Sequence, residues 1–412
     1  MSLIKNSIYN IAGFAVPTVI AIPALGLLAR QIGTEFFGIF TLAFALIGYA
    51  SIFDAGVTRA VIREISINRD NYEEQQKVIS TASIVVILLG TIAALLIITF
   101  ASELVTLLKV TESLASQVIL SFKILATIIP FFLLNQVWLA SLEGLEKFAN
   151  INIQRIISSS ALAVLPPLAC MFHPNIVFAI LGLVVGRVLS LIITLILCKK
   201  IIFDSGIKLS LSTLKRLLSF GGWLTLSNII SPLMVYFDRF IISNMMGASK
   251  IAFYSAPAEG VARLINIPYA LARALFPKLS YCSSHQERRV LERHSYFLVT
   301  ITCLPLVIGG TLLSHFVMTV WMGEEYGGEA ADILKILLIG FFFNALAQIP
   351  YSLLQAQGKS KITALVHMYE IIPYIAMLFF FTHNFGIRGT AIAWSIRTGA
   401  DLLLLYFISR RK

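Results

Sequence analysis

The chain has 412 residues, of which 58% are hydrophobic and 13% charged, and its formal net charge is +11. A soluble domain carries roughly 25% charged residues, and a disordered chain has low hydrophobicity, so both classes are excluded. Since one membrane-spanning helix needs about 20 mostly apolar residues, the composition indicates a protein that crosses a membrane many times. The four cysteines have no CxxC spacing and the six histidines no ligand spacing, so we expect no disulfide framework, metal site or cofactor.

Twelve apolar stretches follow one another along the chain and are separated by short polar segments. Each is long enough to cross the hydrocarbon core as a helix. The first is too long for the apolar region of a signal peptide, so we count it as a span. The spans are expected at about 8–29, 36–57, 78–101, 117–141, 151–172, 175–198, 217–243, 251–278, 295–321, 331–356, 362–383 and 386–408.

The basic residues between these spans are distributed unevenly. With the N-terminus in the cytoplasm, 21 Lys and Arg residues fall in inner segments and four in outer loops. Cytoplasmic loops of membrane proteins are enriched in Lys and Arg. The bias therefore predicts a multi-pass protein with both termini in the cytoplasm, and the net positive charge needs no nucleic acid to explain it. No loop exceeds roughly twenty residues, which leaves no room for an extramembrane catalytic domain.

The chain repeats itself weakly at an offset of 214 residues. Gly33 falls on Gly247, Arg59 on Arg273 and Gly144 on Gly358, in the same order. This pattern predicts two six-helix lobes, at 1–208 and 209–412. An even number of spans per lobe gives both lobes the same orientation, and such parallel repeats are typical of transporters with the substrate path at the repeat interface.

Several basic residues fall inside or beside the expected spans, where an ionisable side chain is costly and is a functional candidate. A guanidinium group binds phosphate oxygens bidentately, so a ladder of cations suits an anionic cargo. The candidate substrate-binding cations are Arg59 and Arg273 at the inner level, Arg187, Arg263 and Arg397 in the middle, and Lys123, Arg239 and Lys335 at the outer level.

Arg187 is the cation that local pairing explains least well. It lies about twelve residues into its span and has no carboxylate three or four residues away. Structural explanations stay open for the others. Glu259 and Arg263, like Arg397 and Asp401, are four residues apart and can neutralise each other. Lysines near a boundary can extend to the headgroups.

Among the acidic residues, Glu370 stands alone in the sequence, one turn before Pro373. A buried carboxyl group can carry a proton, which suits ion coupling. Alternatively, it hydrogen-bonds to backbone groups that the proline leaves without partners. The candidate residues for ion coupling or gating are Glu370, Asp54, Asp238, Glu259 and Asp401.

Several strings along the whole chain resemble those of the Wzx-type polysaccharide flippases, members of the polysaccharide transporter family in the MOP exporter superfamily. These strings occur together and in order. They are GTEFFGIFTLA (33–43), FDAGVTRA (53–60), SNIISPLMVYFDRFII (227–242), FYSAP (253–257), ALFPKLS (274–280), LLQAQGKSK (353–361), HMYEIIPY (367–374) and AIAWSIR (391–397).

The resemblance implies an all-α, MATE-like membrane fold with two lobes around a cationic lumen. It implies that an undecaprenyl-diphosphate-linked O-antigen unit passes from the cytoplasmic to the periplasmic leaflet of the bacterial inner membrane, with H⁺ or Na⁺ coupling. The expected partners are this lipid-linked oligosaccharide, membrane lipids, and, as candidate protein partners, an O-antigen polymerase and a chain-length regulator.

Three other functions are weighed against this hypothesis. A multidrug antiporter of the same fold is disfavoured by the embedded cations, which suit anions. A membrane polysaccharide polymerase or ligase is disfavoured because no large periplasmic loop is present. A purely structural scaffold gives no reason to keep costly charges inside the membrane.

Overall fold

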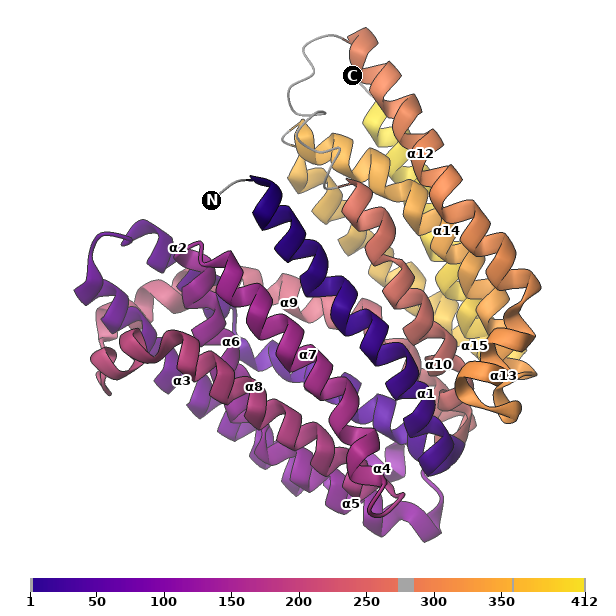
Figure 1. Ribbon diagram of the computed structural model, residues 1–412, viewed down its shortest axis with the longest axis horizontal. Coiled ribbons are helices and arrows are strands. Elements are labelled where there is room, and N and C mark those ends of the chain that lie inside the picture. Colours follow the sequence, from indigo (N-terminus) through magenta and orange to yellow (C-terminus); the bar gives the residue numbers. More distant parts are fainter. Residues whose placement is uncertain (1–2, 273–284, 358, 411–412) are drawn as a thin grey trace. The chain divides into compact units, whose positions relative to one another are not determined.

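The computed structural model describes residues 3–272, 285–357 and 359–410, and the regular structure within these ranges is helical (Figure 1). Eight of the described helices are long and apolar enough to span a membrane. Two of the longest contain two predicted spans each, because α1 (Leu3–Ala50) breaks at Gly33 and α15 (Ser360–Arg410) breaks at Gly386. The described residues of the twelve predicted stretches are almost entirely helical, although some stretches contain a short break between two helices, and this confirms the all-α membrane fold.

The two breaks occur at glycines because the backbone there has positive φ, which other residues rarely adopt. Gly33 has φ 76° and ψ 172°, and Gly386 has φ 62° and ψ −148°. Gly247, the sequence match of Gly33, precedes α10 (Ala248–Leu264) with φ 90° and ψ 160°. The first repeat match therefore joins two positions with the same backbone conformation.

The chain divides into two compact units, Met1–Phe237 and Asp238–Lys412, and α9 (Leu211–Met246) continues from the first into the second. The predicted division into lobes 1–208 and 209–412 stays a prediction. The first unit also contains α1, η1 (Ser51–Asp54), α2 (Val57–Ile67), α3 (Tyr72–Thr99), α4 (Ala101–Leu107), α5 (Glu112–Thr127), α6 (Ile129–Gly144), α7 (Phe148–Cys170) and α8 (Ile176–Ser205).

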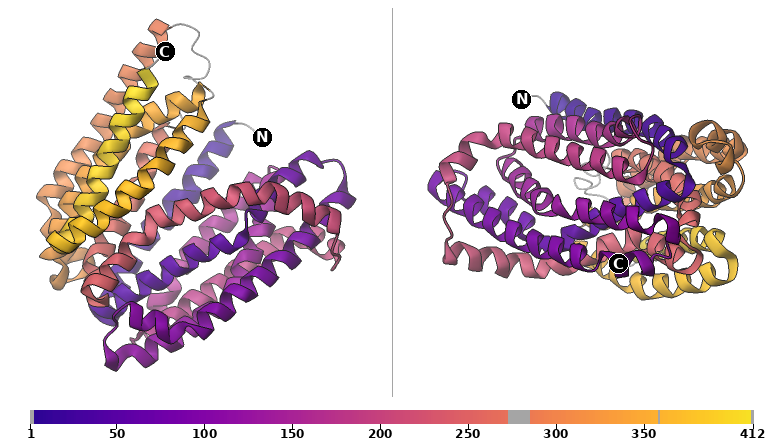
Figure 2. Two further views of the ribbon diagram at one scale, coloured as in Figure 1. Left: turned by 180° about the vertical axis from the view of Figure 1, so that it is seen from behind. Right: turned by 90° about the horizontal axis from the view of Figure 1, so that it is seen from below.

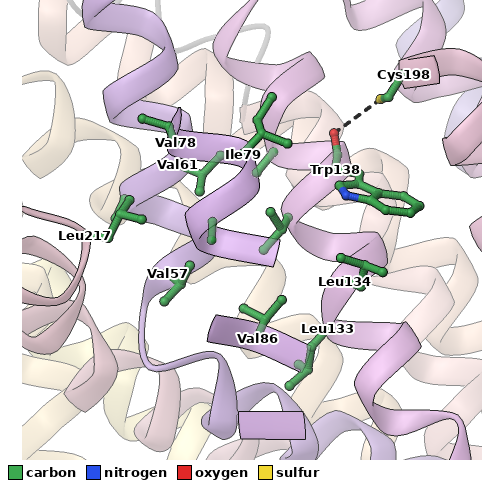
Figure 3. Packing of buried hydrophobic residues seen from close by; sticks show 14 of the residues in the cluster. Val57, Val61, Val78, Ile79, Val86, Leu133, Leu134, Trp138, Cys198 and Leu217 are labelled. Carbon is green, nitrogen blue, oxygen red and sulfur yellow. Dashed lines mark hydrogen bonds between the residues drawn. The ribbon is translucent and has the colours of Figure 1, made fainter. Parts of the chain in front are cut away.

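A core of small and branched side chains joins the helices of the first unit (Figure 3). The thiol of Cys198 also donates to the carbonyl of Trp138 over 3.5 Å, which links α8 to α6. Core residues come from α2, α3, α6, α8 and the start of α9, and include Val57, Val61, Val78, Ile79, Val86, Leu133, Leu134, Trp138, Cys198 and Leu217.

Ion pairs gather where the polar segments of the first unit meet. Arg216, near the start of α9, contacts Glu64 at 3.3 Å and Glu74 at 2.9 Å. Arg69, in the turn before α3, contacts Glu146, in the turn before α7, at 3.0 Å. The hydrogen bond from Arg69 lowers the pKa of the Glu146 carboxyl below its usual value.

The second unit is organised around α14 (Glu329–Ala356). This helix packs against α10, α12 (His285–Leu312), α13 (Ser314–Met322) and α15, and η2 (Glu324–Tyr326) lies between α13 and α14. Gly386 divides α15 into two arms, and helix α14 runs beside both of them (Figure 2). The close packing of α14 against α15 depends on Gly340, because a Cβ there would lie 2.5 Å from the Trp394 ring of α15.

Candidate functional site

Arg187 lies on α8, next to two glycines at which this helix packs closely against α7. Gly182 and Gly186 are four residues apart and share one face of the helix. A Cβ at Gly182 would lie 2.5 Å from the Leu165 carbonyl oxygen, and one at Gly186 would lie 3.1 Å from the Leu162 side chain. Small residues allow two membrane helices to approach this closely. The glycines therefore set the position of the neighbouring arginine.

The guanidinium of Arg187 contacts aromatic rings instead of carboxylates. Its central carbon lies 4.7 Å from the ring centroid of Phe132, on α6, and 5.9 Å from that of Phe44, in the second part of α1. Its Nε has no hydrogen-bond partner, and no ion pair neutralises it among the residues that the structure describes. Aromatic faces attract a cation but do not cancel its charge. Arg187 is therefore an embedded, uncompensated cation.

Next to Arg187, one turn along α8, lies an uncharged polar cluster. Ser190 accepts a hydrogen bond from Gln154 of α7 at 2.9 Å and a longer one from Asn135 of α6 at 3.4 Å. All three side chains are buried, and the Asn135 Oδ1 atom has no partner. These residues were not among the predicted site residues, although amides within apolar spans could have indicated them.

A second group of charged residues connects α9 to α10 in the second unit. Glu259 accepts from Arg239 and from Arg263, each at 2.7 Å. Asp238 accepts from the Tyr254 hydroxyl at 2.5 Å and from the Arg239 backbone N–H at 2.7 Å. The pairing of Glu259 with Arg263 is as the spacing predicted. Two arginines and two carboxylates balance, so this group presents no excess charge to a cargo.

A third group lies between the two arms of α15, which fold back on each other at Gly386. Arg397 Nε lies 3.7 Å from Glu370 Oε2, and its guanidinium carbon lies 5.3 Å from the centroid of the Tyr374 ring. His367 Nε2 lies 3.4 Å from Asp401 Oδ1. Glu370, which stands alone in the sequence, has a partner in the fold, because the hairpin brings the second arm against it. Arg397 pairs with Glu370 instead of with Asp401, its neighbour on the same arm.

The Glu370 carboxyl group is buried, yet neither of its oxygens has a hydrogen-bond partner. Its alternative role, bonding to backbone groups freed by Pro373, is therefore not seen in this structure. A cavity of about 300 Å³ opens between the arms of α15 beside it. The lining residues are Val366, Tyr369, Glu370, Pro373, Met377, Arg397, Ala400 and Leu404. The cavity thus combines apolar walls with one guanidinium and one carboxyl group.

The remaining candidates lie apart from these three groups. Asp54 is buried and accepts from the backbone N–H of Thr58 at 3.0 Å, so it is bound to the first turn of α2. Arg59 and Lys123 are exposed. Lys335 pairs with Asp332 at 3.0 Å, as does Arg388 at 2.7 Å.

Arg273 lies outside the described residues. Within the described ranges, no group of three His, Cys, Asp or Glu side chains is arranged to hold a metal ion.

Comparison with known proteins adds two findings. Residues 3–283 match the family model of polysaccharide biosynthesis proteins. The chain is 50% identical over 411 residues to the Shigella flexneri protein named "Putative O-antigen transporter", and the match covers 100% of this chain and 98% of that protein.

Two solved structures have the same fold. The lipid II flippase MurJ, in an inward closed conformation, matches with a TM-score of 0.81 and 16% identity over 98% of this chain and 87% of MurJ. An inward-facing multidrug resistance MATE family transporter of the MOP superfamily matches with a TM-score of 0.76 and 15% identity, over 97% of this chain and 93% of the transporter. At these identities the likeness concerns the fold alone.

Proposed function

We propose, from the premise that this chain belongs to the polysaccharide biosynthesis protein family, that it is the flippase for a lipid-linked O-antigen repeat unit. As a membrane-spanning member of a polysaccharide transporter family it is a transporter and not an enzyme. The proposed cargo is an undecaprenyl-diphosphate-linked oligosaccharide. It moves from the cytoplasmic to the periplasmic leaflet of the inner membrane, and both termini of the protein lie in the cytoplasm.

The observation that carries this proposal is the uncompensated guanidinium of Arg187. A buried charge without a counterion is costly, so a protein that keeps one has a use for it. Phosphate oxygens fit a guanidinium bidentately, and the diphosphate of the proposed cargo supplies both the missing charge and the missing hydrogen-bond acceptors. Arg397, whose Nε also lacks a hydrogen bond, is the second candidate contact.

In the proposed mechanism the protein alternates between inward-open and outward-open states, with H⁺ or Na⁺ as the coupling ion. The charged headgroup and the sugars follow the cation-lined path while the polyprenyl chain stays in the lipid. Arg239 and Arg263 serve as structural members of that path, because Glu259 and Asp238 already balance their charges. An O-antigen polymerase and a chain-length regulator are the proposed downstream partners.

A multidrug antiporter is the second candidate, since a MATE transporter shares the fold. Such a protein, if it carried organic cations, would place carboxylates without counterions in its path. Arg187 is the opposite arrangement, which favours the anionic cargo.

The test uses a strain that lacks the gene and is complemented with variants of the chain. We expect Arg187→Ala with Arg397→Ala to abolish surface O-antigen, and lipid-linked repeat units to accumulate on the inner leaflet. Arg388→Ala is the matched control, because this exposed arginine pairs with Asp332 and lies outside the site. Normal O-antigen in the double variant, at equal membrane levels of protein, would reject the proposed role of these residues.

A deletion strain also separates the competing functions. Loss of polymerised glycan while repeat units still reach the outer leaflet would point to a polymerase. Increased drug resistance on overexpression, with unchanged O-antigen, would point to the multidrug antiporter. Ion coupling is tested in vesicles by collapsing the H⁺ gradient and the Na⁺ gradient in turn. Translocation should slow only when the gradient of the coupling ion is collapsed.

A further inference from the structure

The ion pair between Glu370 and Arg397 differs from the other embedded pairs of the second unit. Glu259 accepts a hydrogen bond from Arg239 and one from Arg263, each at 2.7 Å. Arg397 Nε lies 3.7 Å from Glu370, without a hydrogen bond, and both Glu370 oxygens lack any hydrogen-bond partner. Separating this pair therefore breaks no hydrogen bond, so Arg397 can change its partner at low cost.

The cavity beside this pair has the chemistry of an amphiphile site. Its volume of about 300 Å³ is at the lower end of the usual range for ligand pockets. Apart from Arg397 and Glu370, its walls are mainly apolar, with Pro373, Met377 and Leu404 among them. A phosphate joined to a hydrocarbon chain matches both the guanidinium and these walls.

We propose that Arg397 exchanges Glu370 for the phosphate group of an amphiphile that enters this cavity, and that Glu370 takes up one proton when it loses Arg397. The identity of the amphiphile as the prenyl-diphosphate end of the cargo rests on the proposed function. The proton passes from water to a carboxylate oxygen of Glu370, and no other bond forms or breaks. Glu370 can accept it without giving up a hydrogen bond to Arg397, because the two side chains form none.

The groups around Glu370 support this exchange. Asp401 acts on it electrostatically from the opposite arm of α15, whereas, among the described carboxylates, the guanidinium of Arg397 lies 3.7 Å from Glu370 alone. His367 lies on the same arm as Glu370 and contacts Asp401. When a phosphate draws Arg397 away, these two acids remain together, and a bound proton removes their mutual repulsion.

The other elements packed here contribute phenols and no further carboxylate among the described residues. Tyr374 stacks on Arg397, and Tyr254 of α10 lies near Tyr374. Tyr351 of α14 stacks on His367 with ring centroids 5.9 Å apart. Tyr269, in the helical residues 266–272, lies near Arg397 and Asp401. The groups whose protonation can change when the ligand binds are thus Glu370, Asp401 and His367.

Linkage gives the sign of the effect. If the ligand-bound state holds one more proton than the free state, the ligand binds more tightly as the pH falls, by up to about tenfold per pH unit. The variant Glu370→Gln mimics the protonated acid and leaves Arg397 unpaired. It should therefore bind the ligand tightly and without this proton uptake.

The experiment uses the full chain in nanodiscs of phosphatidylcholine, with farnesyl diphosphate as the probe. Calorimetric titrations in buffers of different ionisation enthalpy count the protons taken up per bound probe. The wild type should take up about one proton more than Glu370→Gln. The probe can itself change protonation on binding, and subtracting the proton count of the variant from that of the wild type cancels this contribution. Arg397→Gln should weaken binding at least about tenfold.

The matched control is Glu292→Gln, because Glu292 is also buried in this unit and pairs with a different arginine, Arg410, at 3.5 Å. It should keep the wild-type proton uptake. Equal proton uptake by the wild type and Glu370→Gln would overturn the inference, as would unchanged binding by Arg397→Gln. Both results leave the flippase function intact, since accumulation of repeat units in the deletion strain tests that function separately.

A second arm identifies the source of the phosphate. Phosphatidic acid is added to the nanodiscs before farnesyl diphosphate is titrated. If it removes the Glu370-dependent proton uptake, the cavity takes the phosphate of a membrane lipid. If the uptake persists, the cavity prefers the prenyl diphosphate. If neither amphiphile causes Glu370-dependent uptake, the inference is wrong.

Discussion

The guanidinium of Arg187 lies 4.7 Å from the ring centroid of Phe132, and no carboxylate among the described residues neutralises it. Folding must therefore desolvate this charge with only weak compensation from the ring, since a cation–π contact contributes about 0.5–2 kcal/mol. An embedded charge kept at such a cost indicates a use in transport and a disadvantage for stability.

Replacement of this arginine should separate stability from function. We expect Arg187→Met to raise the free energy of unfolding by roughly 1–2 kcal/mol, because it removes an uncompensated charge, and to abolish O-antigen export. Thermal unfolding of the purified protein and gels of surface O-antigen measure the two effects. A large loss of stability would instead show that Arg187 is structural.

Replacement of Glu259 should lower the stability of the protein, whereas replacement of Arg187 should raise it. Glu259→Gln leaves one buried arginine, Arg239, and one partly buried arginine, Arg263, without their shared carboxylate, and we expect a loss of about 3 kcal/mol. Adding Arg239→Met should restore part of this loss, because one unpaired cation is then removed. Denaturation of the single and double variants measures the coupling. Additive losses would contradict the proposed network.

Gly182 and Gly309 form a matched pair for testing helix packing. A Cβ at Gly182 would lie 2.5 Å from a backbone oxygen of α7, whereas a Cβ at Gly309 would meet nothing within 4 Å. Gly309→Ala should therefore be neutral or stabilise by up to about 1 kcal/mol. Gly182→Ala should lower the Tm and also reduce transport, because it displaces the helix that carries Arg187. Equal effects of both substitutions would exclude close packing as the cause.

The Arg69–Glu146 pair provides a pH-dependent prediction outside the spans. Because Arg69 lowers the pKa of Glu146 in the folded protein, the pair stabilises the fold above the usual glutamate pKa of 4.5. This contribution is lost as the pH falls through the lowered pKa. The Tm difference between the wild type and Glu146→Gln should therefore be present at pH 7 and vanish in acid. Both side chains are exposed, so the difference should be small and should shrink in high salt.

Much of the fold was predictable from the sequence because a bilayer imposes simple rules. Apolar length predicted the helices, and the break at Gly33 matches that at Gly247 in backbone conformation. The i,i+4 spacing of Glu259 and Arg263 predicted their ion pair correctly. These features depend on neighbours along one helix, which the sequence displays directly.

Pairings between helices were not predictable in the same way. The spacing suggested Asp401 as the partner of Arg397, but the α15 hairpin brings Glu370 to that position. The rings that cover Arg187 come from α1 and α6, far from it in the chain. Nothing in a linear pattern states which helix faces will meet.

The sequence by itself determined that this chain is a helical membrane protein with costly charges inside its spans, because apolar length and charge are properties of single segments. Only the tertiary structure decided which charges are neutralised. Arg239 and Arg263 share Glu259, Arg397 has a loose partner in Glu370, and Arg187 has none among the described residues. The physical reason is that electrostatic energy depends on distance through space, which the packing of the helices sets.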